Sequence, residues 1–317
     1  MIRWGIIGYG NIARRFIKSL KASPTGKLMA IASRSKTEEV QKDYPDVKIY
    51  EDYETLLADE SIDVVYIALP HKLHVPLSLL ALQAKKGVFT EKPAGLNAQE
   101  VLEVLTFAQK HQIFYGEALK TRYNQALSHL QHMINKGVVG PLTFMYANFC
   151  DDFSHLPANH HFFDRQQGGA LLDLGSYPLG LISMFNPSEL DEVQVKMELE
   201  EGIDRKTNAT LFFRDGMKAH IEVSSTHIET RTAFLKGEKG MVYLQDSNRP
   251  TAYTVVTSEG TKTYEFPFTT DDMSFEIEAV NRAIQQGLIE TPEYPHQDIY
   301  RISQFMDAIA QHKHKIL

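Results

Sequence analysis

The feature that most limits how this chain can fold lies at its start, where the apolar run Ile2–Ile7 leads into Gly8-Tyr9-Gly10-Asn11-Ile12-Ala13. An amphipathic segment, Asn11–Ala22, follows, so the glycines lie between an expected strand and an expected helix. There Gly8 allows a tight turn, and Gly10, which has no Cβ, lets the backbone approach phosphate groups. The free N–H groups of the helix start attract the same anion. A plain turn is the alternative, but this context favours a dinucleotide site formed by Gly8, Gly10, Asn11 and Ile12.

The composition is that of an ordinary globular protein. The chain has 317 residues, of which 43% are hydrophobic and 23% charged, which is enough for two domains with full cores. The net charge of −7 disfavours nucleic acid and membrane surfaces as partners, and no apolar stretch is long enough to span a membrane. Met1 leads directly into the first expected strand, so we expect a cytoplasmic protein. The single cysteine, Cys150, excludes an internal disulfide and a cysteine-rich zinc site, and we expect a buried thiol.

Residues 1–120 are expected to form a domain with a doubly wound parallel sheet, because short apolar runs alternate with helical patterns. The expected strands are Ile2–Ile7, Lys27–Ser33, Asp63–Leu69, Gly87–Thr90 and Ile113–Gly116. The expected helices are Asn11–Ala22, Tyr53–Ala58, His74–Ala84 and Ala98–His111. Asn11, Asp52 and Asn97 are in positions typical of helix N-caps.

Residues 121–317 are expected to form an α+β domain with a large, open, mostly antiparallel sheet, because strand patterns joined by tight turns predominate from Asp191 to about Phe266. A further strand is expected at Pro141–Cys150, and helices at Arg122–Lys136, Ala170–Phe185, Asp271–Gln286 and about Gln297–His312. The last helix is free to pack back on the first domain. Helices are evident for one face of the sheet only, so we expect a second copy of the chain to cover the other, in a homodimer or homotetramer.

Ligands of such parallel sheets bind at the carboxyl ends of the strands, so the residues that follow each strand are the candidates. After Lys27–Ser33 no acidic residue occurs that would select NAD through its ribose hydroxyl. Ser33 and Arg34 are suited instead to the 2′-phosphate of NADP, although a solvated loop arginine is the alternative. We therefore expect NADP in preference to NAD.

Two further strand ends supply candidates for the nicotinamide site. Leu69, His71 and His74 follow one strand, and a histidine there either contacts the cofactor or packs at the helix start. Glu91-Lys92-Pro93 follows the next strand, where Lys92 would point into the cleft. Hydride transfer to or from a carbinol needs a proton donor or acceptor on the substrate oxygen, and a lysine with a lowered pKa serves this purpose. A surface lysine is the alternative.

A second cluster of candidates lies in Gly168-Gly169-Ala170-Leu171-Leu172-Asp173-Leu174-Gly175-Ser176-Tyr177. Asp173 and Tyr177 are four residues apart in an expected helix, so they would share a face. A carboxylate on an apolar segment needs a partner, and Lys92 is a suitable one. Without that partner, Asp173 would be an ordinary surface carboxylate.

The motifs G-Y-G-N-I-A at 8–13, Ser33-Arg34, E-K-P at 91–93, E-A-L-K-T-R-Y at 117–123 and G-G-A-L-L-D-L-G-S-Y at 168–177 occur in order over both domains. Together they resemble the glucose–fructose oxidoreductase, inositol dehydrogenase and MocA family (Gfo/Idh/MocA), and most of all its dimeric dihydrodiol dehydrogenase branch. The resemblance implies an NADP-dependent enzyme that acts on a sugar, an inositol or a cyclic diol.

The resemblance also implies roles for individual residues. Lys92 would be the catalytic lysine, Asp173 would position the substrate and tune Lys92, and Tyr177 would be an acid/base group or a substrate contact. Glu91 and Pro93 would shape the nicotinamide site, and Arg122 would orient the domain junction or contact the cofactor. Two residues depart from the family pattern: Asn124 replaces a common proline, and Lys120 replaces an aromatic residue. A cation at 120 would favour polar or anionic substrates over aromatic diols.

The loop before Gly168 adds Arg165 as a substrate contact, together with three histidines, His155, His160 and His161. Their spacing is too loose for a zinc site, and we expect no metal. Two alternatives to a freely exchanging enzyme remain open: a nicotinamide-binding sensor without turnover, and an enzyme that retains its cofactor between two substrates. The sequence names neither the substrate nor the direction of the reaction.

Overall fold

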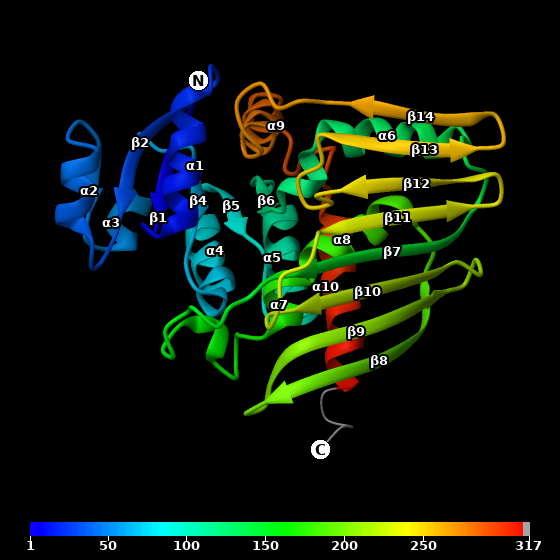
Figure 1. Ribbon diagram of the computed structural model, residues 1–317. Helices are drawn as coiled ribbons and strands as arrows, with labels where there is room; N and C mark the ends of the chain where they lie inside the picture. Colours follow the sequence, from blue (N-terminus) through cyan, green and yellow to red (C-terminus); the bar gives the residue numbers. More distant parts are fainter. Residues whose placement is uncertain (313–317) are drawn as a thin grey trace. The chain divides into compact units, whose positions relative to one another are not determined.

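The structure is a computed structural model that describes residues 1–312, and it divides the chain into two compact units (Figure 1). The first unit comprises Met1–Ala118 and Thr269–Tyr300, and the second comprises Leu119–Phe268 and the residues from Arg301 onward. This differs from the expected division in residues 269–300, which belong to the first unit. Within residues 1–312 no helix is long and apolar enough to cross a membrane.

The first unit is a parallel sheet of six strands in the order β3-β2-β1-β4-β5-β6, which confirms the doubly wound fold. Its strands are β1 (Ile2–Ile7), β2 (Gly26–Ala32), β3 (Lys48–Tyr50), β4 (Val64–Ile67), β5 (Gly87–Glu91) and β6 (Tyr115–Ala118). Its helices are α1 (Asn11–Ala22), α2 (Thr37–Asp43), α3 (Tyr53–Ala58), α4 (His74–Gln83), α5 (Ala98–His111) and α9 (Ser274–Gln285). The strand order reverses between β1 and β4, so the loops that leave these two strands adjoin, as at ligand sites of such sheets.

The short elements β3 and α2 were not expected from the sequence, because Val40 is the only buried residue of α2 and β3 has three residues. Two of the three predicted N-caps are confirmed: Asp52 accepts a hydrogen bond from Thr55 N, and Asn97 accepts one from Glu100 N. The third prediction was wrong, since Gly10 caps α1 and Asn11 is already helical.

Helix α9 belongs to the first unit because polar groups attach it to β1 and α1. The indole of Trp4, which is fully buried, donates a hydrogen bond to Asn281 Oδ1 at 2.8 Å. Arg15 forms an ion pair with Asp272 at 2.9 Å, just before the helix. These contacts join residues more than 250 positions apart, so no local sequence pattern reports them.

The second unit is built on an eight-stranded sheet in the order β14-β13-β12-β11-β7-β10-β9-β8. Only β7 and β10 pair in parallel, so the predicted mostly antiparallel sheet is confirmed. The strands are β7 (Leu142–Cys150), β8 (Leu190–Glu200), β9 (Ile203–Phe213), β10 (Lys218–Ser224), β11 (Thr232–Gly237), β12 (Gly240–Gln245), β13 (Ala252–Thr257) and β14 (Gly260–Glu265). The helices are α6 (Gln125–Asn135), α7 (Ala170–Leu174), α8 (Ser176–Phe185) and the part of α10 (His296–Ala310) from Arg301 onward.

Two predicted helices of this unit are each divided in the structure. The expected helix 122–136 is a 3₁₀ turn, Lys120–Tyr123, followed by α6, because Asn124 is extended and its side chain caps Leu127 N. The expected helix 170–185 is divided at Gly175 into α7 and α8. Asp173 and Tyr177 therefore lie on consecutive helices rather than on one.

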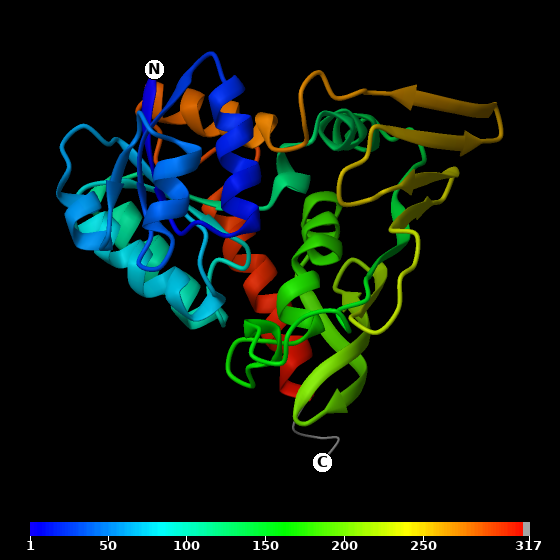
Figure 2. The ribbon, with the colours of Figure 1, turned by 60° about the vertical axis from the view of Figure 1, so that its left-hand side comes forward.

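The helices of the second unit lie against one face of its sheet (Figure 2). On that face Phe149 and Val223 pack with Ala170 and Leu174 of α7, and Phe305 of α10 contacts Phe213 with ring centroids 5.8 Å apart. The opposite face carries a row of neighbouring rings, in which Tyr146 lies 5.4 Å from Phe234 and 6.1 Å from His220. Side chains alternate between the two faces, as a strand requires.

Candidate active site

The glycine turn after β1 has the geometry of an anion site. Gly8 has a φ of +101°, and a Cβ there would lie 2.4 Å from the Ala68 carbonyl oxygen, so only glycine fits. A Cβ on Gly10 would meet no atom within 4 Å, so space lies open beside that backbone. No side chain caps α1 and its first turn holds no acidic residue, which leaves the N–H groups of residues 11–13 for a bound anion. These features fit a dinucleotide pyrophosphate.

The segment after β2 carries the two polar residues Ser33 and Arg34. Ser33 is buried and its amide donates to the Tyr50 carbonyl oxygen at 3.0 Å. Arg34 is exposed, and its guanidinium lies 5.0 Å from the Tyr53 ring and donates from Nε to the Tyr53 hydroxyl at 3.2 Å. The tyrosine holds the arginine stem while the terminal nitrogens stay accessible to a phosphate.

Lys92 directly follows β5 and is half-buried, and its bond to Pro93 is cis. The residues around it are tied down by buried hydrogen bonds. Glu91 accepts one from the Tyr66 hydroxyl of β4, and Glu117 Oε1 accepts one from Ala94 N at 2.7 Å. The lysine is therefore presented by a segment that is fixed at both ends.

His74, at the start of α4, also holds this segment. Its Nδ1 lies 2.7 Å from the Pro93 carbonyl oxygen and its Nε2 lies 2.7 Å from the Leu69 carbonyl oxygen. Both partners are acceptors, so a doubly protonated ring satisfies both contacts. His71 is buried beside it, with ring centroids 5.7 Å apart. His74 thus joins the ends of β4 and β5, and its contact with a cofactor stays a prediction.

Glu117, on β6, is a buried carboxyl group within the E-A-L-K-T-R-Y motif, and no role was expected for it from the sequence. Burial raises its pKa to about 7, and the nearby Glu91 carboxylate acts in the same direction. The hydroxyl of Tyr294, the Ala94 amide and Lys92 oppose the shift. A group that titrates near neutrality beside Lys92 marks this strand end as a functional region.

The raised pKa of Glu117 makes stability depend on pH. The folded protein holds this proton more tightly than the unfolded chain, whose pKa is 4.5, so the stabilisation is complete below pH 4.5 and is lost as the pH rises through 7. Relative to Glu117→Gln, which does not titrate, we expect wild type to lose about 3 kcal/mol of unfolding free energy between pH 4.5 and 8. Urea unfolding at pH 4.5 and pH 8 measures this loss. Glu103→Gln, at an exposed position, is the control. If the difference in unfolding free energy between wild type and Glu117→Gln does not change with pH, the raised pKa of Glu117 is contradicted.

In the second unit, the predicted residues lie along α7, α8 and the 3₁₀ turn. Asp173 is half-buried on α7, and Tyr177 on α8 stacks on Phe149 with centroids 4.7 Å apart. Lys120 is half-buried, and Arg122 is buried and donates from Nη1 to the Gly180 carbonyl oxygen at 3.3 Å. The roles of these four residues in catalysis or binding stay predictions.

The start of α7 depends on a residue that the sequence analysis missed. Asp204, buried on β9, accepts a hydrogen bond from Leu171 N at 2.7 Å. Gly169 has a φ of +110°, and a Cβ there would lie 2.1 Å from Asp204 Oδ1. The glycine pair before α7 therefore allows a carboxylate to cap the helix that carries Asp173.

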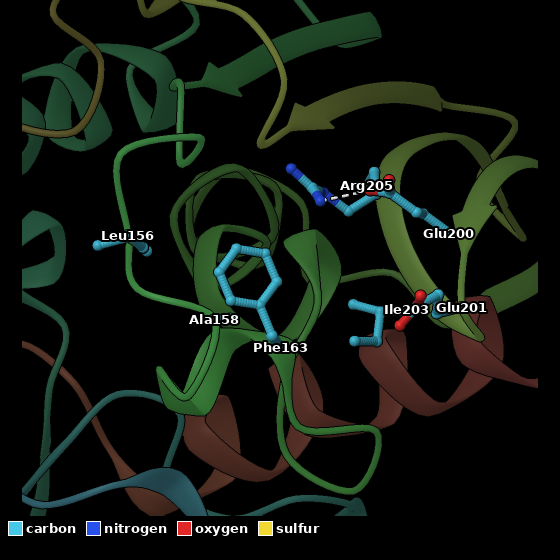
Figure 3. A pocket seen from close by; sticks show the side chains of 7 residues that line it. All are labelled: Leu156, Ala158, Phe163, Glu200, Glu201, Ile203 and Arg205. Carbon is cyan, nitrogen blue, oxygen red and sulfur yellow. Dashed lines mark hydrogen bonds and ion pairs between the residues drawn. The ribbon is translucent and has the colours of Figure 1, made fainter.

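The loop after β7 and the β8–β9 turn line a cavity of about 360 Å³ (Figure 3). Phe163 and Ile203 supply apolar surface, and Arg205 is fixed by an ion pair with Glu200 at 2.5 Å. Arg165 is exposed and lies near the same turn, 3.8 Å from where a Gly202 Cβ would be. Of the three loop histidines, His160 and His161 have ring centroids 4.1 Å apart, and His155 bonds to the Asp152 carbonyl oxygen.

Family profiles match the two parts of the chain separately. Residues 2–118 match the profile described as "Oxidoreductase family, NAD-binding Rossmann fold" of Gfo/Idh/MocA, and residues 127–243 match the C-terminal domain of the same family. The chain belongs to the Gfo/Idh/MocA family. The predicted family, the oxidoreductase class and the nicotinamide cofactor are confirmed.

Curated relatives of this Gfo/Idh/MocA oxidoreductase include trans-1,2-dihydrobenzene-1,2-diol dehydrogenases. The protein of Mus musculus is 32% identical over 93% of this chain and 91% of its own length. The protein of Homo sapiens is 30% identical over 97% and 96%. The predicted likeness to the dihydrodiol dehydrogenase branch is therefore confirmed.

Solved structures are similar along the whole chain. A 3-ketoreductase from Actinomadura kijaniata, in complex with NADP and TDP-benzene, is 25% identical, with a TM-score of 0.87 and coverage of 98% of this chain and 97% of its own. An aldose-aldose oxidoreductase from Caulobacter crescentus, complexed with glycerol, has a TM-score of 0.89 at 17% identity over 100% and 98%. The second likeness concerns the fold alone.

Proposed function

We propose that this Gfo/Idh/MocA oxidoreductase uses NADP to oxidise a CH–OH group of a cyclic diol, a sugar or a related polyol, or to reduce the corresponding carbonyl group. The observation that carries the proposal is the carboxyl edge of the first sheet, where the open space at Gly10 and the fixed Lys92 follow β1 and β5. The curated relatives act on a cyclic diol, and the 3-ketoreductase was solved with NADP, which supports both halves of the proposal.

The proposed chemistry of the chain is proton transfer. The nicotinamide, when bound, supplies or accepts the hydride. Lys92 donates a hydrogen bond from Nζ to the substrate oxygen, and it gives or takes the proton as the carbon is reduced or oxidised. Asp173 holds the substrate and stabilises the lysine ammonium, and the Tyr177 hydroxyl binds the neighbouring oxygen. Vicinal hydroxyl groups suit such a pair, because each has its own polar partner.

A substrate screen with the purified full-length chain tests this proposal. Cyclic diols, inositols and sugars would be offered with NADP⁺, and the corresponding ketones with NADPH, while the absorbance of the reduced nicotinamide is followed. We expect turnover with at least one polar cyclic substrate. Cofactor that binds but is turned over with none of these classes would contradict the proposed substrate class.

Arg34 is proposed to select NADP. Its replacement by alanine removes a charge-assisted hydrogen bond worth about 1.5–3 kcal/mol, so the affinity for NADPH should fall roughly 10- to 100-fold. The affinity for NADH, which lacks the 2′-phosphate, should stay the same. Arg249→Ala, which replaces an exposed arginine of the second unit, serves as the control. An equal loss of affinity for NADPH and NADH in Arg34→Ala would refute the selective role of Arg34.

We also propose that the chain works as a homo-oligomer whose copies meet through the open face of the eight-stranded sheet. The support is the row of rings on that face, which includes Tyr146, Phe234 and the exposed Tyr243. Aromatic side chains are enriched in such interfaces. Sedimentation of the full chain tests this proposal, and a monomer at micromolar concentration would contradict it.

A further inference from the structure

The ends of β7 and β10 form a second chemical cluster, apart from the residues proposed for catalysis. These two strands pair in parallel, with Cys150 opposite Ser224. Phe149 and Val223 pack against α7, so the alternating Cys150 and Glu222 lie on the sheet face away from the helices. The turn after β10, residues 225–231, carries His227.

Three different metal-binding groups meet at this point. The Cys150 sulfur, a Glu222 carboxylate oxygen and a His227 ring nitrogen all lie within 4.8 Å of one another. Thiolate, imidazole and carboxylate are the ligands that Zn²⁺ takes in proteins, and around a tetrahedral ion such atoms are about 3.5 Å apart. Binding of an ion would therefore draw these three atoms together by up to about 1 Å.

The neighbouring groups hold two of these side chains in place. Ser224 Oγ lies 3.0 Å from His227 Nδ1, and Lys206 Nζ lies 2.7 Å from Glu222 Oε1. Glu229 Oε1 lies 3.3 Å from His227 Nε2 and adds a second carboxylate beside the cluster. Such outer partners orient metal ligands in known sites. A divalent cation would balance the thiolate and the two carboxylates together with Lys206.

We propose that Cys150, Glu222 and His227 bind one Zn²⁺ ion per chain, which ties the turn 225–231 to the end of the sheet. Binding converts the Cys150 thiol to a zinc-bound thiolate and releases its proton to the buffer. The fourth position of the tetrahedral site is left to a water molecule. From the sequence we expect a buried Cys150 thiol and no metal. A zinc ion at this site would contradict the expected absence of a metal.

Titration of the metal-free full-length protein with Co²⁺ and Zn²⁺ tests the proposal. One equivalent of Co²⁺ should produce a thiolate-to-cobalt charge-transfer band, which Zn²⁺ then abolishes. Calorimetry in two buffers with different ionisation enthalpies should show proton release on Zn²⁺ binding. Cofactor affinity and turnover do not enter this experiment, so its outcome is independent of the proposed function.

Variants assign the ligands. Cys150→Ala should abolish the charge-transfer band. Each of the three ligand variants, Cys150→Ala, Glu222→Gln and His227→Gln, should lower the affinity for Zn²⁺ by more than about 100-fold. Ser224→Ala, which removes an outer partner of His227, should lower that affinity about tenfold. His155→Gln, a histidine of the loop after β7, is the matched control and should leave binding unchanged. If Cys150→Ala does not fold, Glu222→Gln and His227→Gln still decide the result. Co²⁺ binding without the charge-transfer band, or binding lost in His155→Gln, would overturn the proposal.

Discussion

Replacement of Lys92 by alanine is expected to lower turnover about a thousandfold and to leave NADPH binding nearly unchanged. A positioned acid/base group contributes about 10²- to 10⁴-fold to the rate of proton transfer. Lys92 follows β5 in a segment fixed by the hydrogen bonds of Glu91 and Ala94, so the substitution removes the ammonium group without loosening its support. Steady-state kinetics with a substrate from the screen, together with NADPH titration, measures both effects.

The matched control for Lys92 is Lys85→Ala. Lys85 is exposed and lies just before β5, at the opposite end of that strand. The Lys85→Ala variant should turn over the substrate at the wild-type rate. If Lys92→Ala keeps more than about a tenth of the wild-type rate, another group transfers the proton and the mechanism is wrong.

Gly10→Val is expected to abolish cofactor binding in a protein that still folds. A Cβ at this position has no protein atom within 4 Å, and the φ of Gly10 is −87°, which any residue adopts. The cost in unfolding free energy should therefore stay below about 1 kcal/mol, mostly from a poorer N-cap. The branched side chain fills the space that the pyrophosphate needs, so NADPH affinity should fall more than about 100-fold, which corresponds to about 2.7 kcal/mol.

Gly8→Ala provides the contrast within the same turn. Its Cβ would lie 2.4 Å from the Ala68 carbonyl oxygen at a φ of +101°, so we expect a loss of roughly 1–3 kcal/mol in unfolding free energy. Denaturant unfolding and NADPH titration of both variants separate the two effects. If Gly10→Val binds NADPH as wild type does, the turn is not the pyrophosphate site.

Local patterns were sufficient for much of the fold. The bounds of β1, α1, α3 and α5 agree with those expected, because each has a clear apolar pattern bounded by a turn or a cap. The divided helices show where periodicity misleads. Asn124 is a capping residue inside an otherwise helical pattern, and its side chain starts α6 where the periodicity alone predicts an unbroken helix.

The features that the sequence could not reveal depend on residues far apart in the chain. Glu117 is buried on β6, and its hydrogen-bond partners Ala94 and Tyr294 are 23 and 177 positions away in the sequence. The cluster at Cys150 likewise needs the parallel pairing of β7 with β10. Strand ends were predictable as places for functional groups, whereas the partners that fix or tune those groups follow from tertiary packing.

The central claim is that the chain binds NADP and uses it for hydride transfer. The most direct measurement is a titration of the purified protein with NADPH and, separately, NADH, followed by nicotinamide fluorescence. We predict saturable binding of NADPH at least about tenfold tighter than that of NADH, as expected from one additional charge-assisted contact at Arg34. Equal affinities would contradict the preference for NADP, and binding of neither cofactor would contradict the proposed function itself.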